Sequence, residues 1–246
     1  MAADSLSWIV PRLSPRWALF LDVDGTLLDI AARPELVEVP PGLTPLLAQL
    51  AQRLEGALAI VSGRALADID GLFQPHRFPA AGIHGAERRD ALGELHLAGH
   101  ASTALEPARA ALREFVALHP GLLLEDKGRS LALHFRQAPH LEGAARELAE
   151  RLLAVLPPGT QLQPGHSVIE IKGAAATKRT AIEQFLQEPP FAGRVPVFLG
   201  DDLTDEDGLS CVEAMGGHAV FVGTKPQPGR GWLPHPAAVR AWLGSL

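Results

Sequence analysis

The chain has 246 residues, of which 47% are hydrophobic and 20% are charged, and its formal net charge is −6. This length and composition are typical of a folded protein with one large domain or two smaller ones. The net negative charge, without a basic cluster, argues against nucleic acids and acidic membranes as partners.

The single cysteine, Cys211, excludes an intramolecular disulfide and favours a reducing compartment. No stretch of about 18 uninterrupted apolar residues is present, so the sequence predicts no membrane-spanning helix. Residues 1–16 lack the apolar segment of a signal peptide, and we expect them to form a loosely held arm. Together these features predict a cytoplasmic protein.

The first part of the chain alternates between apolar strands and helices. Three strands are predicted to end near Asp22, Ser62 and Gly82, and a helix is predicted over residues 44–54, after two prolines. Strands separated by helices indicate a parallel sheet with helices on its faces. Because the crossover connections are right-handed, the carboxyl ends of the strands are expected to meet at one edge.

Residues 102–173 follow a different pattern. Helices are predicted over residues 104–118 and 139–156, and each is followed by a hairpin. The first hairpin, within residues 122–136, turns at residues 127–128. The second joins strands 160–163 and 167–172 through residues 164–166. This helix–hairpin–helix–hairpin pattern of about 70 residues predicts an α+β domain inserted into the parallel sheet.

The first pattern returns after a hinge that we predict at residues 173–177. A helix over residues 178–187, strands ending near Leu199 and Val222, and a last helix over residues 237–243 are predicted. The proline-rich residues 226–236 are predicted to be a surface connection. The sheet domain would then comprise residues 1–101 and 174–246.

Two carboxylates, Asp22 and Asp24, follow the first apolar strand, although burial of that strand gives no reason for charge there. Residues two apart in an extended segment project to the same side, so both carboxylates surround one point. Gly25 and Thr26 add a tight turn and a hydroxyl. This arrangement is typical of a site for a hard divalent cation and a phosphoryl group. An ordinary Asp-Gly turn is the alternative.

A second acidic group follows another apolar strand, because residues 201–207 contain five acidic side chains in seven. Charge runs are commonly solvated surface, but this one begins where parallel sheets place their ligands. Between the two acidic groups, a strand ends in Ser62 and Arg64, and Lys178 stands at a predicted helix start. The sequence therefore predicts acidic, hydroxyl and cationic groups around one site.

The order Asp-x-Asp-Gly-Thr, strand-Ser, Lys and Gly-Asp-Asp resembles the four motifs of the haloacid-dehalogenase (HAD) phosphohydrolases. Residues 82–89, 125–136, 168–172 and 200–207 are similar to signatures of the trehalose-6-phosphate phosphatase family. The resemblance implies an α/β fold, in which a Rossmann-like parallel sheet core (the HAD fold) carries an inserted α+β cap domain for substrate specificity.

The resemblance also implies roles for the acidic residues. Asp22 would be the nucleophile that forms an aspartyl-phosphate, and Asp24 would be the general acid and base. Mg²⁺ would be held by Asp22, by the backbone carbonyl of Asp24 and by Asp201, with Asp202 and Asp205 supporting these ligands.

The remaining implied residues would contact the substrate. The phosphate would be bound by Thr26, Ser62, Arg64 and Lys178, and the sugar by His84, Arg88, Glu125, Lys127 and Glu170. Alternatives stay open for several of them. Lys178 is also compatible with a solvated helix residue, Arg64 with a surface salt bridge, His84 with a structural histidine, and the three cap residues with cross-strand ion pairs.

The implied function is Mg²⁺-dependent hydrolysis of trehalose 6-phosphate to trehalose and phosphate. The core motifs leave open the same chemistry on another sugar phosphate, such as sucrose 6-phosphate or a mannosyl phosphate. A phosphomutase is less favoured because it must exclude water. A catalytically silent sugar-phosphate sensor is disfavoured because the catalytic acids and the motif lysine are all present. We expect a monomer with a small-molecule substrate, and association with a trehalose-phosphate synthase stays open.

Overall fold

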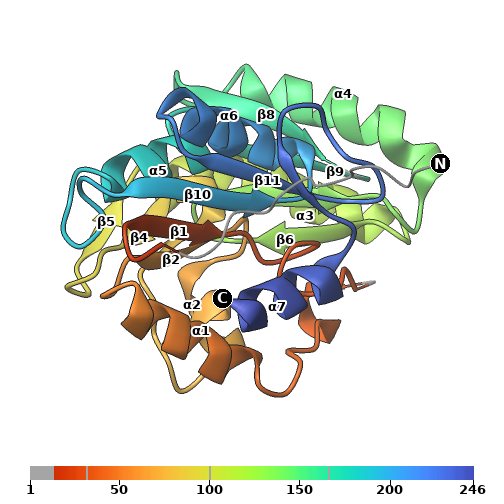
Figure 1. The fold of residues 1–246 in the computed structure, drawn as a ribbon. Coiled ribbons are helices and arrows are strands. Elements are labelled where there is room, and N and C mark those ends of the chain that lie inside the picture. The colour runs from red at the N-terminus through yellow and green to blue at the C-terminus, as the bar shows by residue number, and fades with distance from the viewer. Residues whose placement is uncertain (1–13, 32, 100, 166) are drawn as a thin grey trace. The chain divides into compact units, whose positions relative to one another are not determined.

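The computed structural model describes residues 14–31, 33–99, 101–165 and 167–246 (Figure 1). Most of the arm predicted for residues 1–16 lies outside the described residues. The chain forms two compact units. We call residues up to His96 together with Lys178–Leu246 the sheet unit, and Leu97–Thr177 the inserted unit. The sequence predicts the inserted domain over residues 102–173, and the compact unit is slightly longer at both ends.

The sheet unit is built on an eight-stranded sheet in the order β12-β11-β10-β1-β2-β3-β4-β5. The strands are β1 Trp17–Leu21, β2 Leu58–Val61, β3 Ala80–Gly82, β4 Glu87–Arg89, β5 Leu95–Leu97, β10 Val195–Gly200, β11 His218–Val222 and β12 Gly231–Leu233. Neighbours from β12 to β3 are parallel, and β4 pairs antiparallel with β3. The predicted α/β class with a mostly parallel sheet is confirmed.

Helices cover both faces of this sheet. They are α1 Leu43–Arg53, α2 Leu66–Leu72, α5 Lys178–Phe185, α6 Glu206–Ala214 and α7 Pro236–Ser245, with short 3-10 helices η1 Pro34–Leu36, η2 Ile83–Gly85 and η5 Leu203–Asp205. Figure 1 shows α1 and α7 on one face and α5 and α6 on the other. Because β1 and β10 are central and covered on both faces, every residue of β1 is buried.

Aromatic side chains fill the core between the sheet and α5. The ring of Phe20 on β1 lies 6.0 Å from that of Phe185 and 5.6 Å from that of Phe191, measured between centroids. Each such buried side chain contributes about 1.5–3 kcal/mol to the free energy of unfolding. This packing fixes β1 against α5, and both elements carry residues of the candidate site.

The inserted unit is a four-stranded antiparallel sheet in the order β6-β7-β9-β8, with two helices. Its elements are η3 Ser102–Leu105, α3 Glu106–Leu118, β6 Leu123–Asp126, β7 Leu131–His134, η4 Pro139–Leu141, α4 Glu142–Leu153, β8 Thr160–Gly165 and β9 Val168–Gly173. Leu131, Leu133, Ile169 and Ile171 alternate along β7 and β9 and are buried in one cluster with Leu112 of α3. The residues between them face the other side of the sheet.

Several short elements were missing from the sequence-based description. The hairpin strands β4 and β5, helix α2 and strand β12 have three to seven residues each. Such lengths are too short for a clear hydrophobic period. Residues 226–236, predicted as a surface connection, are corrected here because they contain β12, which pairs with β11 at Val220↔Gly231. Strand β8 also continues through Pro164 and Gly165, where a turn was predicted.

Across the described ranges, none of the helices has the length and the apolar character that crossing a membrane would require.

Candidate functional site

Three carboxylates converge at the carboxyl end of the parallel sheet. Asp22 follows β1, Asp201 follows β10, and Asp205 lies in η5. Strands β1 and β10 are direct neighbours, with Leu21 opposite Leu199, so the residues that follow them are adjacent. One oxygen from each of the three carboxylates lies within 4.8 Å of the others. Asp22 is only 3% exposed and Asp205 is fully buried.

Lys178 lies among these carboxylates as the first residue of α5. Its Nζ donates hydrogen bonds of 2.6 Å to Asp22 Oδ1 and of 2.6 Å to Asp205 Oδ1. Burial by itself would lower the pKa of Lys178, but Asp205 and Asp22 outweigh burial and hold the pKa above its ordinary value. The lysine is therefore a buried cation and not a solvated surface charge.

One lysine does not balance three carboxylates. Burial, followed by repulsion from Asp205, raises the pKa of Asp22 well above its ordinary value. Burial and then Asp205 and Asp202 raise the pKa of Asp201 to about 7. Burial also raises the pKa of Asp205, against the attraction of Lys178. A cluster of oxygen donors with this excess of negative charge is the chemistry that a hard divalent cation prefers.

The turn after β1 packs directly against Asp201. Gly25 has φ +85°, and a Cβ added there would lie 2.1 Å from Asp201 Oδ2. Glycine is therefore required both for the backbone conformation and for the space. The hydroxyl of buried Thr26 donates to Asp201 Oδ1 at 3.1 Å. Thr26 thus orients one of the acidic side chains from the neighbouring turn.

The acidic residues after β10 have separate roles. Asp205 Oδ2 accepts hydrogen bonds from the backbone N–H groups of Asp201 at 3.1 Å and Asp202 at 3.2 Å. Asp202 Oδ1 accepts from the N–H and the hydroxyl of Thr204, both at 2.6 Å. The two aspartates form a capping box for η5. The run is therefore an ordered turn in which Asp205 is buried, while Asp202 and Asp207 are exposed, so only part of it is solvated acidic surface.

Asp24 is held by Arg64. The guanidinium donates from Nε to Asp24 Oδ2 and from Nη2 to Asp24 Oδ1, at 2.7 Å each. A two-bond pair of this kind fixes the orientation of a carboxylate as well as its position. The backbone N–H of Arg64 also donates to the hydroxyl of buried Ser62 at 3.2 Å. Ser62, Arg64 and Asp24 therefore form one connected group at the ends of β1 and β2.

His84 lies against the same turn. It is buried, and a Cβ added to Gly63 would lie 2.8 Å from two ring atoms of His84. The backbone N–H of His84 donates to Ser62 O at 2.9 Å. Ile83 and His84 both have positive φ, 49° and 54°, which is uncommon for residues other than glycine and often accompanies functional sites. The structure therefore brings His84 to the Ser62 turn.

Arg88 lies elsewhere. It is buried and donates to both oxygens of Glu188 at 2.8 Å and to Gln184 Oε1 at 3.1 Å. Its guanidinium carbon is 5.0 Å from the ring centroid of Phe185. These contacts tie β4 to the carboxyl end of α5. The structure does not bring Arg88 into the cluster around Asp22, and its expected contact with the sugar stays a prediction.

The face of the inserted sheet away from its hydrophobic cluster carries three of the predicted sugar-binding residues. Ala132 of β7 is paired with Glu125 on one side and with Glu170 on the other, so the three form one row across the sheet. Lys127 Nζ lies 3.8 Å from Glu125 Oε2 and 3.6 Å from Glu170 Oε1. The small side chain of Ala132 separates two carboxylates that share one ammonium group.

Two further residues hold these carboxylates. His134 Nε2 donates to Glu125 Oε2 at 2.9 Å, and Ser130 Oγ donates to Glu170 Oε1 at 2.5 Å. Burial works to raise the pKa of Glu125, but His134 and Lys127 outweigh it and keep the pKa below its ordinary value. The sequence reasoning missed both residues. Both lie two residues from Ala132, Ser130 just before β7 and His134 at its end, and this spacing was the available signal.

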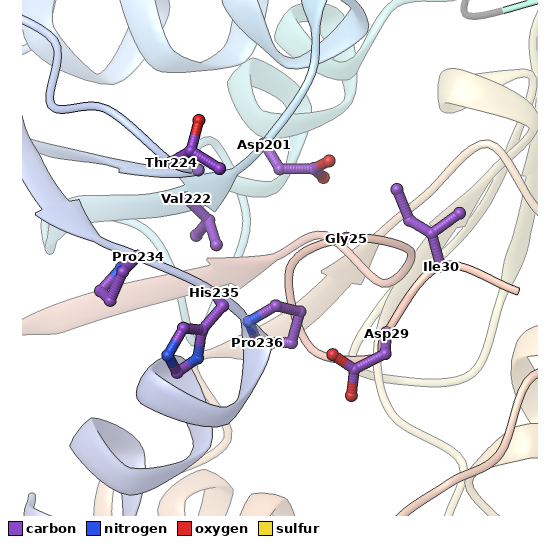
Figure 2. Close-up of a pocket in the computed structure, with 10 residues that line it drawn as sticks. Gly25, Asp29, Ile30, Asp201, Val222, Thr224, Pro234, His235 and Pro236 are labelled. Atoms are coloured by element: carbon purple, nitrogen blue, oxygen red, sulfur yellow. The ribbon is translucent and has the colours of Figure 1, made fainter.

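A pocket of about 270 Å³ adjoins the acidic cluster and was also missed. Figure 2 shows its lining, which includes Gly25 and Asp201 of the site. The other lining residues come from the turn after β1 and from the segments flanking β12: Asp29, Ile30, Val222, Gly223, Thr224, Pro234, His235 and Pro236. The segment that follows β11 therefore forms one wall beside Asp201.

Comparisons with known proteins identify relatives of the whole chain. A trehalose-6-phosphate phosphatase of Escherichia coli (strain K12) is 44% identical over 233 residues, which cover 95% of this chain and 87% of the relative. The C-terminal domain of a C. albicans trehalose-6-phosphate phosphatase has a similar structure, with a TM-score of 0.80, 22% identity and coverage of 94% and 92%.

The wider fold family is also recognisable. A phosphatase of the HAD superfamily from Bacteroides thetaiotaomicron matches with a TM-score of 0.60 and 18% identity, over 97% of this chain and 99% of the other. This likeness shows the HAD fold. Residues 20–229 match the family described as trehalose-phosphatase. The chain therefore belongs to the trehalose-phosphatase family of phosphatase enzymes.

Proposed function

We propose that this protein hydrolyses trehalose 6-phosphate to trehalose and phosphate, through an aspartyl-phosphate on Asp22 and with Mg²⁺ as cofactor. The observation that carries the proposal is the buried Asp22 carboxylate, which bonds to Lys178 and lies beside Asp201 and Asp205. The 44% identity to the E. coli enzyme supports the choice of substrate.

The acidic cluster fits the proposed cation. We assign Asp22, Asp201 and the backbone carbonyl of Asp24 to the metal, with Asp202 and Asp205 ordering the turn that carries Asp201. The fit rests on buried oxygen donors whose pKa values are raised by burial and by one another. When bound, the cation supplies positive charge that neutralises the carboxylates and the phosphoryl oxygens.

Hydrolysis then proceeds in two half-reactions. An oxygen of Asp22 attacks phosphorus, the bond between phosphorus and the sugar oxygen breaks, and Asp24 donates its proton to that oxygen. Water next attacks the phosphoryl group on Asp22 while Asp24 accepts a proton from the water. Phosphate leaves, and both carboxyl groups return to their starting states. The two hydrogen bonds from Arg64 fix the orientation of the Asp24 carboxylate in the structure without substrate.

The phosphate is proposed to contact Ser62, Lys178, Thr26 and Arg64. Thr26 and Arg64 also have a second task, because their donors bond to Asp201 and Asp24. Lys178 adds positive charge at the amino end of α5, where helices favour anions. Burial of Ser62 and His84 at the same turn supports a role for both near the substrate.

Substrate preference is proposed to come from Glu125, Lys127 and Glu170 of the inserted unit. Carboxylate and ammonium groups held in fixed positions bind sugar hydroxyls through charge-assisted hydrogen bonds. His134 and Ser130 hold the carboxylates in place. Because a site built for hydroxyl groups is left with unpaired polar groups by other ligands, it discriminates strongly.

The function is tested by measuring phosphate release from trehalose 6-phosphate, sucrose 6-phosphate and glucose 6-phosphate, each with Mg²⁺ and with EDTA. We expect release to be fastest from the trehalose ester and to be lost in EDTA, because the acidic cluster then repels the phosphate. Equal or faster release from another ester would keep the phosphatase and replace the substrate. No release from any ester would favour a silent sensor.

The sugar-binding assignment is tested separately with Glu125→Gln. A hydrogen bond to a charged group is worth about 1.5–3 kcal/mol, so we expect kcat/KM for trehalose 6-phosphate to fall roughly 10- to 100-fold. Activity on p-nitrophenyl phosphate, which lacks the sugar, is expected to stay within about twofold.

The matched control for this test is Glu114→Gln, which changes an exposed glutamate on α3 of the same unit. It should leave both substrates unaffected. An equal loss on both substrates in Glu125→Gln would show that Glu125 serves only the structure of the unit.

We further infer a cytoplasmic monomer that acts on this small molecule. Burial raises the pKa of the single thiol, Cys211, to about 11, which keeps it protonated and poorly reactive. Sedimentation tests the monomeric state, and cell fractionation tests the cytoplasmic location. Co-fractionation with a trehalose-phosphate synthase tests whether this protein associates with the synthase.

A further inference from the structure

One acidic residue of the turn after β10 has no place in the chemistry proposed above. Glu206 directly follows Asp205 and is the first residue of α6. Both of its carboxylate oxygens accept hydrogen bonds from Arg230, Oε2 from Nη1 at 2.8 Å and Oε1 from Nη2 at 2.7 Å. Arg230 comes from the segment between β11 and β12, so it joins that segment to the start of α6.

The same guanidinium continues along α6. It donates from Nε and Nη2 to the two oxygens of Glu213, at 3.0 Å each, and from Nη2 to Ser210 Oγ at 3.2 Å. Residues 206, 210 and 213 share one face of a helix. Arg230 also donates to Gln227 Oε1 at 2.6 Å, within its own segment. Its side chain is 9% exposed, which distinguishes this network from an isolated surface ion pair of little energetic value.

The other end of the segment is fixed beside the metal-binding turn. Trp232 Nε1 donates to Gly223 O at 2.7 Å, and Gly223 N donates to Leu233 O at 3.0 Å. These bonds close the base of the segment 223–230. Gly223 and Thr224 line the pocket that also includes Asp201 (Figure 2). The segment is therefore anchored beside Asp201 at its base and on α6 at Arg230.

We propose that Arg230 is a positioning residue for the divalent cation: by tying segment 223–230 to the first turn of α6, it keeps Asp201 and Asp205 in the arrangement that binds the metal. The connection is short, because Glu206 is the next residue after Asp205 and Asp205 accepts from the backbone of Asp201. This inference depends on one part of the proposed function, the divalent cation as cofactor. It does not depend on which sugar phosphate is the substrate.

The test measures binding of Mn²⁺, a spectroscopic substitute for Mg²⁺, to the enzyme without substrate, by electron paramagnetic resonance. Residues that orient metal ligands indirectly change metal affinity by about tenfold or more, and Arg230 acts one step further out. We expect Arg230→Gln to raise the apparent Kd for Mn²⁺ about three- to tenfold. With metal at saturation, kcat is expected to remain within about twofold, and Arg230→Lys should restore part of the affinity.

Two further variants keep the test decisive. Glu213→Gln, to be used if Arg230→Gln does not fold, removes the ion pair with Glu213 and leaves both hydrogen bonds to Glu206. We expect it to raise the Kd for Mn²⁺ by less than Arg230→Gln would. Arg146→Gln is the matched control, since it breaks an exposed pair with Glu142 in the inserted unit. It should leave Mn²⁺ binding unchanged.

An unchanged Kd in folded Arg230→Gln, or an equal rise in Arg146→Gln, would overturn the inference, and a lower melting temperature alone would assign Arg230 to stability. Failure of the proposed function is recognised separately. A wild-type enzyme that binds Mn²⁺ but does not cleave trehalose 6-phosphate loses its substrate assignment, while the Arg230 comparison still stands. A wild-type enzyme that binds no Mn²⁺ overturns both the cofactor and this inference.

Discussion

Replacing Asp22 by asparagine is expected to lower kcat for phosphate release by at least about 10³-fold, since the amide is a poor nucleophile and covalent catalysis is lost. The fold should persist. Lys178 keeps its second partner, Asp205, and the substitution removes one of three mutually repelling carboxylates. We expect the melting temperature without metal to stay equal to that of the wild type or to rise. Steady-state phosphate release and thermal unfolding measure the two effects.

Asp68→Asn provides the matched control, because it makes the same chemical change at an exposed position of α2. It should leave kcat unchanged. Substantial turnover by Asp22→Asn, beyond what contaminating wild-type enzyme explains, would mean that another group attacks phosphorus. The two-step mechanism on Asp22 would then be wrong.

Replacing Lys178 by methionine is expected to be the most destabilising of these substitutions. The ammonium group is 3% exposed and bonds to two buried carboxylates, and removal of one member of a buried ion pair costs about 3–5 kcal/mol of unfolding free energy. Methionine keeps most of the volume, so the loss is mainly electrostatic. Denaturant unfolding in EDTA measures it. Activity should fall as well, because the phosphate loses a cation.

Mg²⁺ separates the electrostatic cause from a packing defect. A cation that binds only the folded protein stabilises it by mass action. Because the variant has one more uncompensated negative charge in the cluster, we expect it to bind Mg²⁺ more tightly than the wild type does, so the deficit of Lys178→Met should shrink when Mg²⁺ is added. Lys225→Met, at an exposed position, should show no deficit under either condition. A deficit in Lys178→Met that is the same with and without Mg²⁺ would indicate lost packing and would remove the argument that the cluster has excess negative charge.

The sequence predicted the parts of the site that depend on strand direction. Asp22 and Asp201 each follow an apolar strand, and the rule that parallel strands end at one edge is enough to bring them together. Lys178 was placed at a helix start, which the structure confirms. These features depend on local pattern and on handedness, and both can be read from a single chain.

Partners between side chains could not be predicted in this way. Arg64 bonds to Asp24, which is 40 residues away, and Arg88 bonds to Glu188, which is 100 residues away. Either arginine could have turned to a phosphate instead, because a guanidinium binds carboxylate and phosphate with the same geometry. Only the three-dimensional arrangement decides which anion lies within reach, and sequence spacing carries no such information.

The short strands and helices were not predicted from the sequence for another reason. Strand β12 has three residues, and its place in the sheet follows from pairing with β11 and from the contact of Trp232 with Gly223. A residue such as His134 was overlooked because histidine is common on solvated strand faces. Its role depends on its hydrogen bond to Glu125, which lies diagonally across from it on β6. Tertiary context overrides local preference at such positions.

The close contact between Gly25 and Asp201 determines when, during synthesis of the chain, the site can form. Thr26, next to Gly25, is separated from Asp201 by 175 residues of chain, so a ribosome adding about 5–20 residues per second makes the two halves of the site roughly ten seconds or more apart. Until the later half arrives, the early carboxylates have neither lysine nor opposing aspartate, and a growing chain has no catalytic centre. Activity therefore requires that nearly the whole polypeptide has been made and folded. A fragment that stops before residue 201 should be inactive even where its first strands are correctly formed.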